Sequence, residues 1–100
     1  MTTDASVGKP LHHDKRWKRR LSQPVGYRGY HRFDGNGSRI HSDVTFKPRR
    51  KGNWAHWTWI SIDPGRGNVN GVAVSFWAAL RAANASHDRM DAASRLGGYG

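Results

Sequence analysis

The sequence predicts an α+β fold, with a small antiparallel sheet of three strands, or four if residues 69–76 are extended, and one long or broken C-terminal helix. Apolar and polar residues alternate in several stretches between residues 27 and 63, which is typical of strands. Turn-forming glycine, asparagine and proline separate these stretches. Alanine is abundant in the C-terminal third, where apolar residues recur every three or four positions, as in a helix. We therefore expect a flexible basic arm at 1–26 and a single small α+β domain at 27–100.

The arm is predicted from its charge and from its lack of any sustained period. Cations crowd between Lys9 and Arg20, and one indole ring, that of Trp17, lies among them. High charge with low hydrophobicity leaves too little apolar surface to offset the entropy lost on ordering. We expect the arm to order only on binding, and to end near Pro24 and Gly26, which favour a turn.

Residues 27–47 are predicted to form a β-hairpin. The first strand covers residues 27–33, and the segment Asp34-Gly35-Asn36-Gly37-Ser38 favours a turn because glycine and asparagine tolerate positive φ. The second strand covers residues 39–47, where apolar and polar faces alternate as in an antiparallel strand with one wet face. The more apolar face of this second strand carries Ile40, Ser42, Val44 and Phe46.

The third strand, residues 54–63, is rich in aromatic and β-branched residues. Both of its faces carry bulky side chains, and a single helix covers only one face of a sheet. One face carries Trp57 and Trp59, and the other carries Trp54, Ile60 and Ile62. One of these two sets should therefore remain partly exposed, and that exposed face is a predicted ligand site.

The C-terminal third begins ambiguously, because residues 69–76 fit either a fourth strand or the start of the helix. From Ser75 onward the helical period prevails. Residues 84–86 are expected to bend or split the helix, and Gly97 and Gly98 are expected to end it.

The predicted outline resembles the architecture of plant-type Apetala DNA-binding domains, in which a small antiparallel sheet is covered by one helix. The segment Tyr27-Arg28-Gly29 is similar to the opening of that domain. The turn after the first strand is longer here and the third strand is more aromatic, so the resemblance concerns architecture and not membership of the family.

The composition limits the classes of function. The 100 residues carry a net charge of +10, and 13 of the 17 Lys and Arg lie within the first 51 residues. Cysteine is absent, which excludes disulfides and thiolate metal sites. The sequence shows neither a secretory signal nor an apolar stretch long enough for a membrane span. We expect a cytoplasmic protein, or one inside a virion or ribonucleoprotein, with no membrane partner.

The lead interpretation is a non-enzymatic nucleic-acid-binding protein that holds DNA or RNA mainly through phosphates, with aromatic stacking on bases. Arginine and lysine neutralise phosphates, and rings interleaved among them supply stacking surfaces. The candidate phosphate ligands are Lys15, Arg16, Lys18, Arg19, Arg20, Arg28, Arg32, Arg49, Arg50 and Lys51. The candidate stacking residues are Trp17, Tyr30, Trp57 and Trp59.

Two alternatives remain open. The first is an inhibitor or interaction module, of phage or plasmid type, that binds an acidic or nucleic-acid-processing host protein through an exposed Trp pair. The second is a metal-independent ribonuclease, in which histidines act as acid and base and cations stabilise the phosphorane. Its candidate residues are His31, His41, His56, Arg32, Arg39 and Asp43. The sequence shows no metal site, no cofactor motif and no catalytic nucleophile motif, and it leaves the oligomeric state open.

Overall fold

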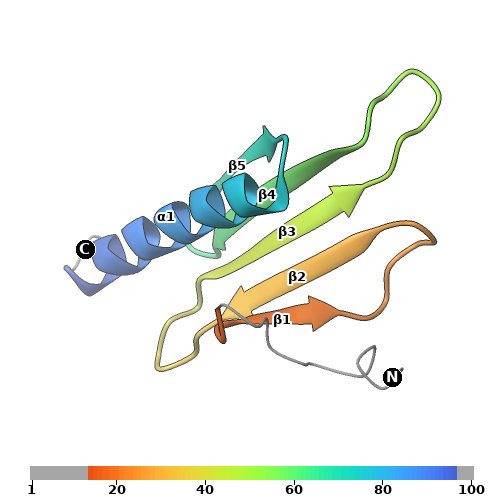
Figure 1. Cartoon of the computed structure of the whole chain (residues 1–100). Coiled ribbons are helices and arrows are strands. Elements are labelled where there is room, and N and C mark those ends of the chain that lie inside the picture. Colours follow the sequence, from red (N-terminus) through yellow and green to blue (C-terminus); the bar gives the residue numbers. More distant parts are fainter. Residues whose placement is uncertain (1–13, 97–100) are drawn as a thin grey trace.

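The computed structural model describes residues 14–96, which form an antiparallel five-stranded sheet with one helix packed across one of its faces (Figure 1). The strands follow one another in the order β1-β2-β3-β4-β5, so that each strand pairs with its neighbour in the chain. The elements are β1 (Trp17–Arg20), β2 (Arg28–Phe33), β3 (His41–Lys47), β4 (His56–Asp63), β5 (Gly67–Ala73) and α1 (Phe76–Arg95). The α+β class is confirmed.

The sheet has five strands, and the prediction of three or four was therefore wrong. Strand β1 comes from the segment predicted to be a flexible arm: Trp17 pairs with Arg32 of β2, and Arg20 pairs with Gly29. The physical reason is Trp17, whose side chain is 0% exposed and belongs to the core. Its burial holds the segment against β2 while three consecutive cations follow it along the strand. Residues 1–13 of the predicted arm lie outside the described residues.

Of the ambiguous segment, residues 69–73 belong to strand β5, and Phe76 is already the first residue of α1. Ser75 caps the helix, since its hydroxyl accepts a hydrogen bond from the backbone N–H of Ala78 at 3.1 Å. The helix then runs unbroken to Arg95, with Leu96 as its C-cap. The predicted break at residues 84–86 is absent, and the predicted terminating glycines lie outside the described residues.

The apolar core lies between α1 and the face of the sheet that carries Trp57 and Trp59. Rings meet there in a chain, because Phe76 lies 5.1 Å from Trp57 and 5.2 Å from Tyr30, measured between ring centroids. Gly71 of β5 leaves room for the indole of Trp59, since a Cβ at this position would lie 2.7 Å from Nε1. The fully or nearly buried members of the core are Trp17, Val44, Ala79, Leu80 and Ala83.

Polar contacts complete the helix–sheet interface toward the end of α1. The hydroxyls of Ser42 and Ser61 lie 2.7 Å apart, and Ser61 also donates to the carbonyl of Ala83 at 3.2 Å. Nδ1 of His87 lies 2.9 Å from the Ser42 hydroxyl. The other ring nitrogen, Nε2, lacks a hydrogen-bond partner among the described residues and lies 3.6 Å from the carboxylate of Asp34. His87 is thus buried in a site that favours its neutral form.

A second polar cluster is centred on Asn84 and explains why the helix does not break there. The Asn84 side-chain carbonyl accepts hydrogen bonds from Nε1 of Trp17 and from Nη1 of Arg32, both at 2.8 Å. Its amide donates to Asp14 at 3.2 Å. Arg32 is 2% exposed and forms ion pairs with Asp34 at 2.8 Å and Asp88 at 2.9 Å. The side chain that predicted a break therefore fastens α1 to β1 and β2.

We predict that the free energy of unfolding falls as the pH is lowered from about 7.5 to about 5.5. Burial, together with the Arg32 cation, lowers the pKa of His87 below its ordinary value of 6.5. The unfolded chain therefore takes up a proton in this window that the folded chain does not, and the loss amounts to about 1.4 kcal/mol for each unit by which the pKa is lowered. Urea unfolding at several pH values measures the effect.

The matched controls are two histidine substitutions. His87→Gln should flatten the pH dependence between pH 7.5 and 5.5, even if the variant is less stable throughout. His56→Gln, on the face of the sheet away from the helix, should retain the dependence of the native chain. The same slope in all three proteins would contradict the assignment to His87.

Candidate nucleic-acid interface

The candidate site begins at the connection between β3 and β4, which projects beyond the strands (Figure 1). We call residues 48–55 the hairpin tip. Within it, Arg50 and Asn53 exchange backbone hydrogen bonds: Asn53 N–H donates to the Arg50 carbonyl at 2.7 Å, and Arg50 N–H donates back at 3.0 Å. Gly52 has φ of +83°, a conformation that glycine adopts without strain. The hairpin tip is therefore a closed turn of defined backbone conformation.

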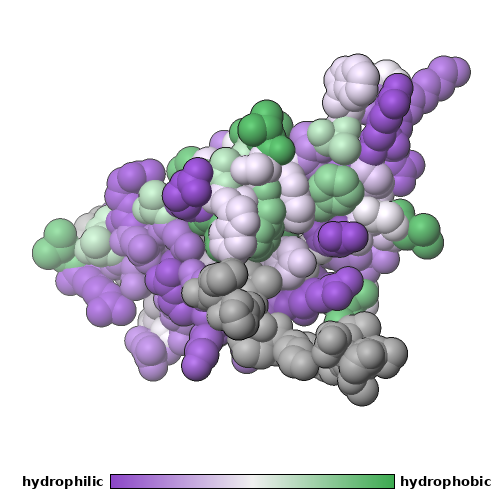
Figure 2. Space-filling view, in the orientation of Figure 1, coloured by the Kyte–Doolittle hydropathy of each residue, from purple (hydrophilic) through white to green (hydrophobic). Residues whose placement is uncertain are grey.

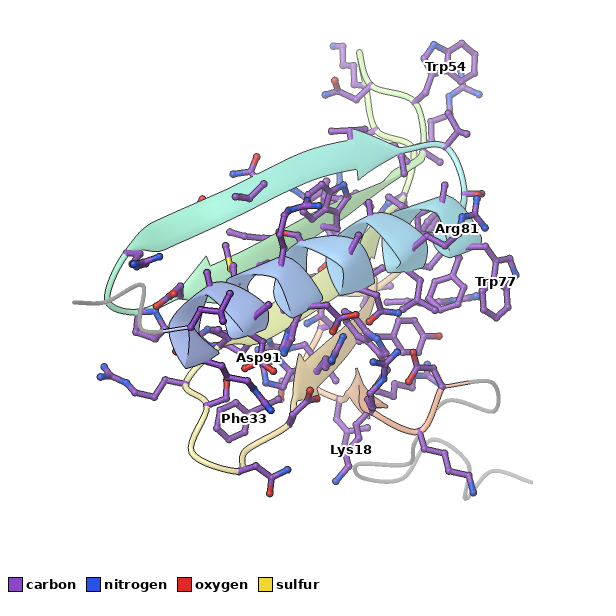
Figure 3. The ribbon with its side chains drawn as sticks, turned by 90° about the vertical axis from the view of Figure 1, so that its left-hand side faces the viewer. Lys18, Phe33, Trp54, Trp77, Arg81 and Asp91 are labelled. Carbon is purple, nitrogen blue, oxygen red and sulfur yellow. The ribbon has the colours of Figure 1, made fainter. Side chains whose placement is uncertain are left out.

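Trp54 is the exposed aromatic residue of the hairpin tip. Its side chain is 75% exposed and points away from the helix and the sheet (Figure 3). The guanidinium carbon of Arg49 lies 4.6 Å from the ring centroid, which is a cation–π contact. A hollow of about 480 Å³ is lined by residues 49–54. The arrangement places an accessible ring directly beside positive charge.

The loop between β1 and β2 supports the base of the hairpin tip. The guanidinium carbon of Arg50 lies 5.2 Å from the ring centroid of Tyr27. Gly26 lies close to Pro48, since a Cβ built on this glycine would lie 3.3 Å from the proline ring. Two loops that are distant in the sequence therefore meet at one end of the sheet, where α1 also begins.

We call this end of the molecule the basic end, because it concentrates positive charge. The described residues at the basic end include no carboxylate, and the first turn of α1 carries no acidic residue, so the positive end of the helix dipole adds to the field. Figure 2 shows the projecting region as strongly hydrophilic. The cations of the basic end are Arg28, Lys47, Arg49, Arg50, Lys51 and Arg81.

Carboxylates gather at the opposite end of the sheet. One carboxylate lies just before β1, one in the turn after β2 and one at the last residue of β4. The other two lie on the second half of α1. These residues are Asp14, Asp34, Asp63, Asp88 and Asp91. The side chain of Arg16 is the main cause that lowers the pKa of Asp14 to about 2, and the Arg32 hydrogen bond likewise lowers the pKa of Asp34. Positive charge at this end is therefore balanced locally, whereas at the basic end it is not.

Three predicted phosphate ligands are engaged in ion pairs. Arg16 contacts Asp14, and Arg20 contacts Asp43, each at 2.8 Å. Arg32 is buried beneath the helix, so its assignment to a nucleic-acid site is corrected: it is a structural cation. Burial opposes its charge most strongly, but the hydrogen bonds to Asp34 and Asp88 outweigh this, and the pKa of Arg32 is raised.

The predicted stacking residues lie on the covered face of the sheet. Trp17 is fully buried, and Tyr30, Trp57 and Trp59 pack partly buried against the core beneath α1. Their rings stack on protein, so we no longer assign base stacking to them. Trp54 was missed as a site residue, although the alternating pattern of the third strand had already offered its face as the second possibility.

The remaining predicted cations divide between two places. Arg49, Arg50 and Lys51 lie together on the hairpin tip, and Arg28 begins β2 at the same end. Three others lie on or next to β1. Lys15 precedes the strand, Lys18 extends away from the helix (Figure 3), and Arg19 is the next residue of the strand. The structure therefore gathers the cations of residues 49–51 into one site and distributes those of residues 15–19 along the edge formed by β1.

The face of the sheet away from the helix carries a separate group of titratable side chains. Nδ1 of His31 lies 2.8 Å from Oδ1 of Asp43, and the rings of His31 and His41 are 5.8 Å apart. Burial raises the pKa of Asp43, but the hydrogen bonds from His31 and Arg20 outweigh it and the pKa is lowered. His56 pairs with Lys47 at the basic end and does not join this group.

One arrangement that suggests other chemistry is inaccessible because it is buried. Ser42, His87 and Asp34 lie in the order of a catalytic triad, but Ser42 and His87 are fully buried and inaccessible to a substrate. Residues 14–96 contain no group of three side chains able to hold a metal ion. Within the same range, no helix has the length and apolar character needed to cross a membrane.

Comparison with known proteins gives no relative for this arrangement. No protein-family model matches the chain, and neither a curated protein nor a solved structure shows significant similarity to it.

We predict that two tryptophan substitutions affect stability to very different extents. Trp54→Ala should change the free energy of unfolding by less than about 0.5 kcal/mol, because the ring contacts little besides Arg49. Trp17→Ala should cost about 3–5 kcal/mol, because it empties a buried site and removes a hydrogen bond to Asn84. Chemical denaturation of both variants measures the difference, and a large loss in Trp54→Ala would place that ring in the core.

Proposed function

We propose that this protein binds nucleic acid, DNA or RNA, at the basic end. The single observation that carries the proposal is the position of Trp54. It is an exposed ring beside Arg49, on a closed turn with Arg50 and Lys51, at an end of the molecule where the described residues include no carboxylate. Nucleic acid is the polyanion that offers both charge and stackable rings.

Phosphate binding supplies most of the affinity in this proposal. Counterions released from the strand drive the association, and the closed turn reduces the entropy lost when the cations are positioned. If the five cations Arg28, Lys47, Arg49, Arg50 and Lys51 each neutralise one phosphate, the slope of log K against log salt is roughly −3.5 for single strands and roughly −4.5 for duplex DNA.

Stacking on Trp54 sets the preference among nucleic acids. One base that stacks on an exposed ring contributes about 1–3 kcal/mol, but the base must first leave its neighbours. A single strand offers unstacked bases at little cost, whereas unpairing and unstacking a base in a duplex costs a few kcal/mol. The proposal therefore favours single strands over duplexes.

We predict that Trp54→Ala weakens binding to a single-stranded oligonucleotide by about 5- to 150-fold, the equivalent of the lost stacking energy. The double variant Arg49→Ala/Lys51→Ala should also weaken binding and should reduce the magnitude of the salt slope by roughly 1.4. Fluorescence anisotropy with single-stranded DNA, duplex DNA and RNA at several salt concentrations measures both effects.

The charge-matched control is Arg89→Ala/Arg95→Ala. Both side chains lie on the second half of α1, away from the basic end, so their removal should alter affinity far less. A salt-independent affinity, or an equal loss in the control, would refute binding at the basic end. Capture of an acidic protein that persists after nuclease treatment, without oligonucleotide binding, would instead support the interaction module.

The second candidate function is metal-independent RNA cleavage on the open face of the sheet. Its support is the pair His31 and His41, because Asp43 holds Nδ1 of His31 and leaves Nε2 free to accept a proton. In this reaction His31 takes the proton of the 2′-hydroxyl, whose oxygen bonds to phosphorus. The bond to the 5′-oxygen breaks, that oxygen takes a proton from His41, and a 2′,3′-cyclic phosphate remains. The neighbouring cation is Lys18, which pairs with His31 across the strands.

We predict that, if this second function operates, purified protein cleaves single-stranded RNA in excess EDTA to products that end in 2′,3′-cyclic phosphate. His31→Ala and His41→Ala should each lower the rate by about 100-fold or more, the usual contribution of a general acid or base. His56→Ala, away from the pair, should be unaffected. Intact RNA after prolonged incubation, or equal loss in His56→Ala, would eliminate the candidate.

A further inference from the structure

Strand β5 is an edge strand whose outer side has no neighbour among the described residues. We propose that β5 of one molecule pairs antiparallel with β5 of a second copy, so that the two sheets become continuous. The inference does not depend on nucleic-acid binding, because it rests on the composition and placement of the strand alone.

The two edges of the sheet differ in how they are protected. Natural sheets guard their edges with short strands, charges and prolines, since an unpaired row of backbone groups recruits another strand. Strand β1 has four residues, and cations occupy its last three positions. Strand β5 has seven residues, with no charge and no proline. Only β5 is therefore built to accept a partner strand.

The side chains of β5 are also open to such a partner. Val72 is 70% exposed and Val69 is 47% exposed, although both are β-branched and suited to a paired strand. A two-fold axis perpendicular to the sheet places the helices of both copies on the same face. In both copies Val69 then lies on the helix-covered face of the joined sheet and Val72 on the open face.

Charge explains why a second copy fits this edge. Two chains with a net charge of +10 repel one another across most surfaces, but no charged side chain lies between Arg66 and Arg81. In an antiparallel pair, the two basic ends lie at opposite ends of the joined sheet. Each basic end then lies beside the end of its partner at which cations and carboxylates balance. Pairing through β5 therefore joins two uncharged strands and keeps the two basic ends apart.

The expected association is weak. Two seven-residue strands bury less surface than a standard interface of about 1,600 Å², so their main-chain hydrogen bonds supply most of the affinity. We expect a dissociation constant in the micromolar range, on the order of 1–100 µM. The dimer should therefore populate at concentrations that light scattering can reach.

Light scattering coupled to size exclusion tests the pairing on nuclease-treated full-length protein across a concentration series. The native chain should approach twice its monomer mass of 11.3 kDa. Asn70→Lys places like charges close to one another near the centre of the paired strands and should raise the dissociation constant at least tenfold. Val72→Lys, at an exposed position, should have the same effect, and circular dichroism confirms that each variant is folded.

The charge-matched control is Val25→Lys, because this side chain is 97% exposed in the loop between β1 and β2 and lies away from β5. It should dimerise as the native chain does. Hydrogen exchange of the native chain provides a second readout, with β5 amides protected more strongly as concentration rises. A native chain that stays monomeric at about 500 µM, or unchanged dimerisation in folded Asn70→Lys and Val72→Lys, would overturn the proposal.

Discussion

The buried guanidinium of Arg32 is the interaction on which the rest of this structure depends. A charge so deeply enclosed is tolerated only when it is paired and fully hydrogen-bonded, and here Asp34, Asp88 and Asn84 provide that environment. These partners come from the turn after β2 and from the middle of α1, so they fix where the helix lies on the sheet. The same requirement places Asp34 and Asp88 at one end of the molecule, away from the basic end.

The position of the helix also decides which aromatic residues serve the core and which serve the surface. With α1 over Trp57 and Trp59, alternation along β4 turns Ile60 and Ile62 to the open face. Trp54 precedes the strand and belongs to the closed turn of the hairpin tip, so no part of the sheet or helix covers it. A small basic chain needs most of its rings inside to be stable. The indole of Trp54, 75% exposed on a projecting turn beside Arg49, is therefore an informative exception.

The hairpin, the aromatic strand and the helix were predictable because their periods are local properties of the sequence. Strand β1 was not, because its assignment depends on Trp17 reaching Asn84, a partner 67 positions away. The same contact explains the unbroken helix, since asparagine weakens an isolated helix but here satisfies three groups from β1, β2 and the segment before them. Charge counting identified the basic segments correctly but not their partners. Whether Arg20 or Arg49 is available to a ligand depends on whether a carboxylate such as Asp43 lies across the sheet.

The same separation of charge makes the two proposed surfaces compatible with one another. Nucleic acid bound at the basic end would leave β5 free, because that strand lies along an uncharged edge and not at the end where the loops meet. Pairing through β5 would in turn set two basic ends facing away from each other. A short oligonucleotide would then fill one site without affecting the second, whereas a strand long enough to reach both would bind with the gain of an intramolecular second contact. The geometry of a neutral edge between two distant cationic ends therefore favours long polyanions over short ones, without any new contact to the ligand.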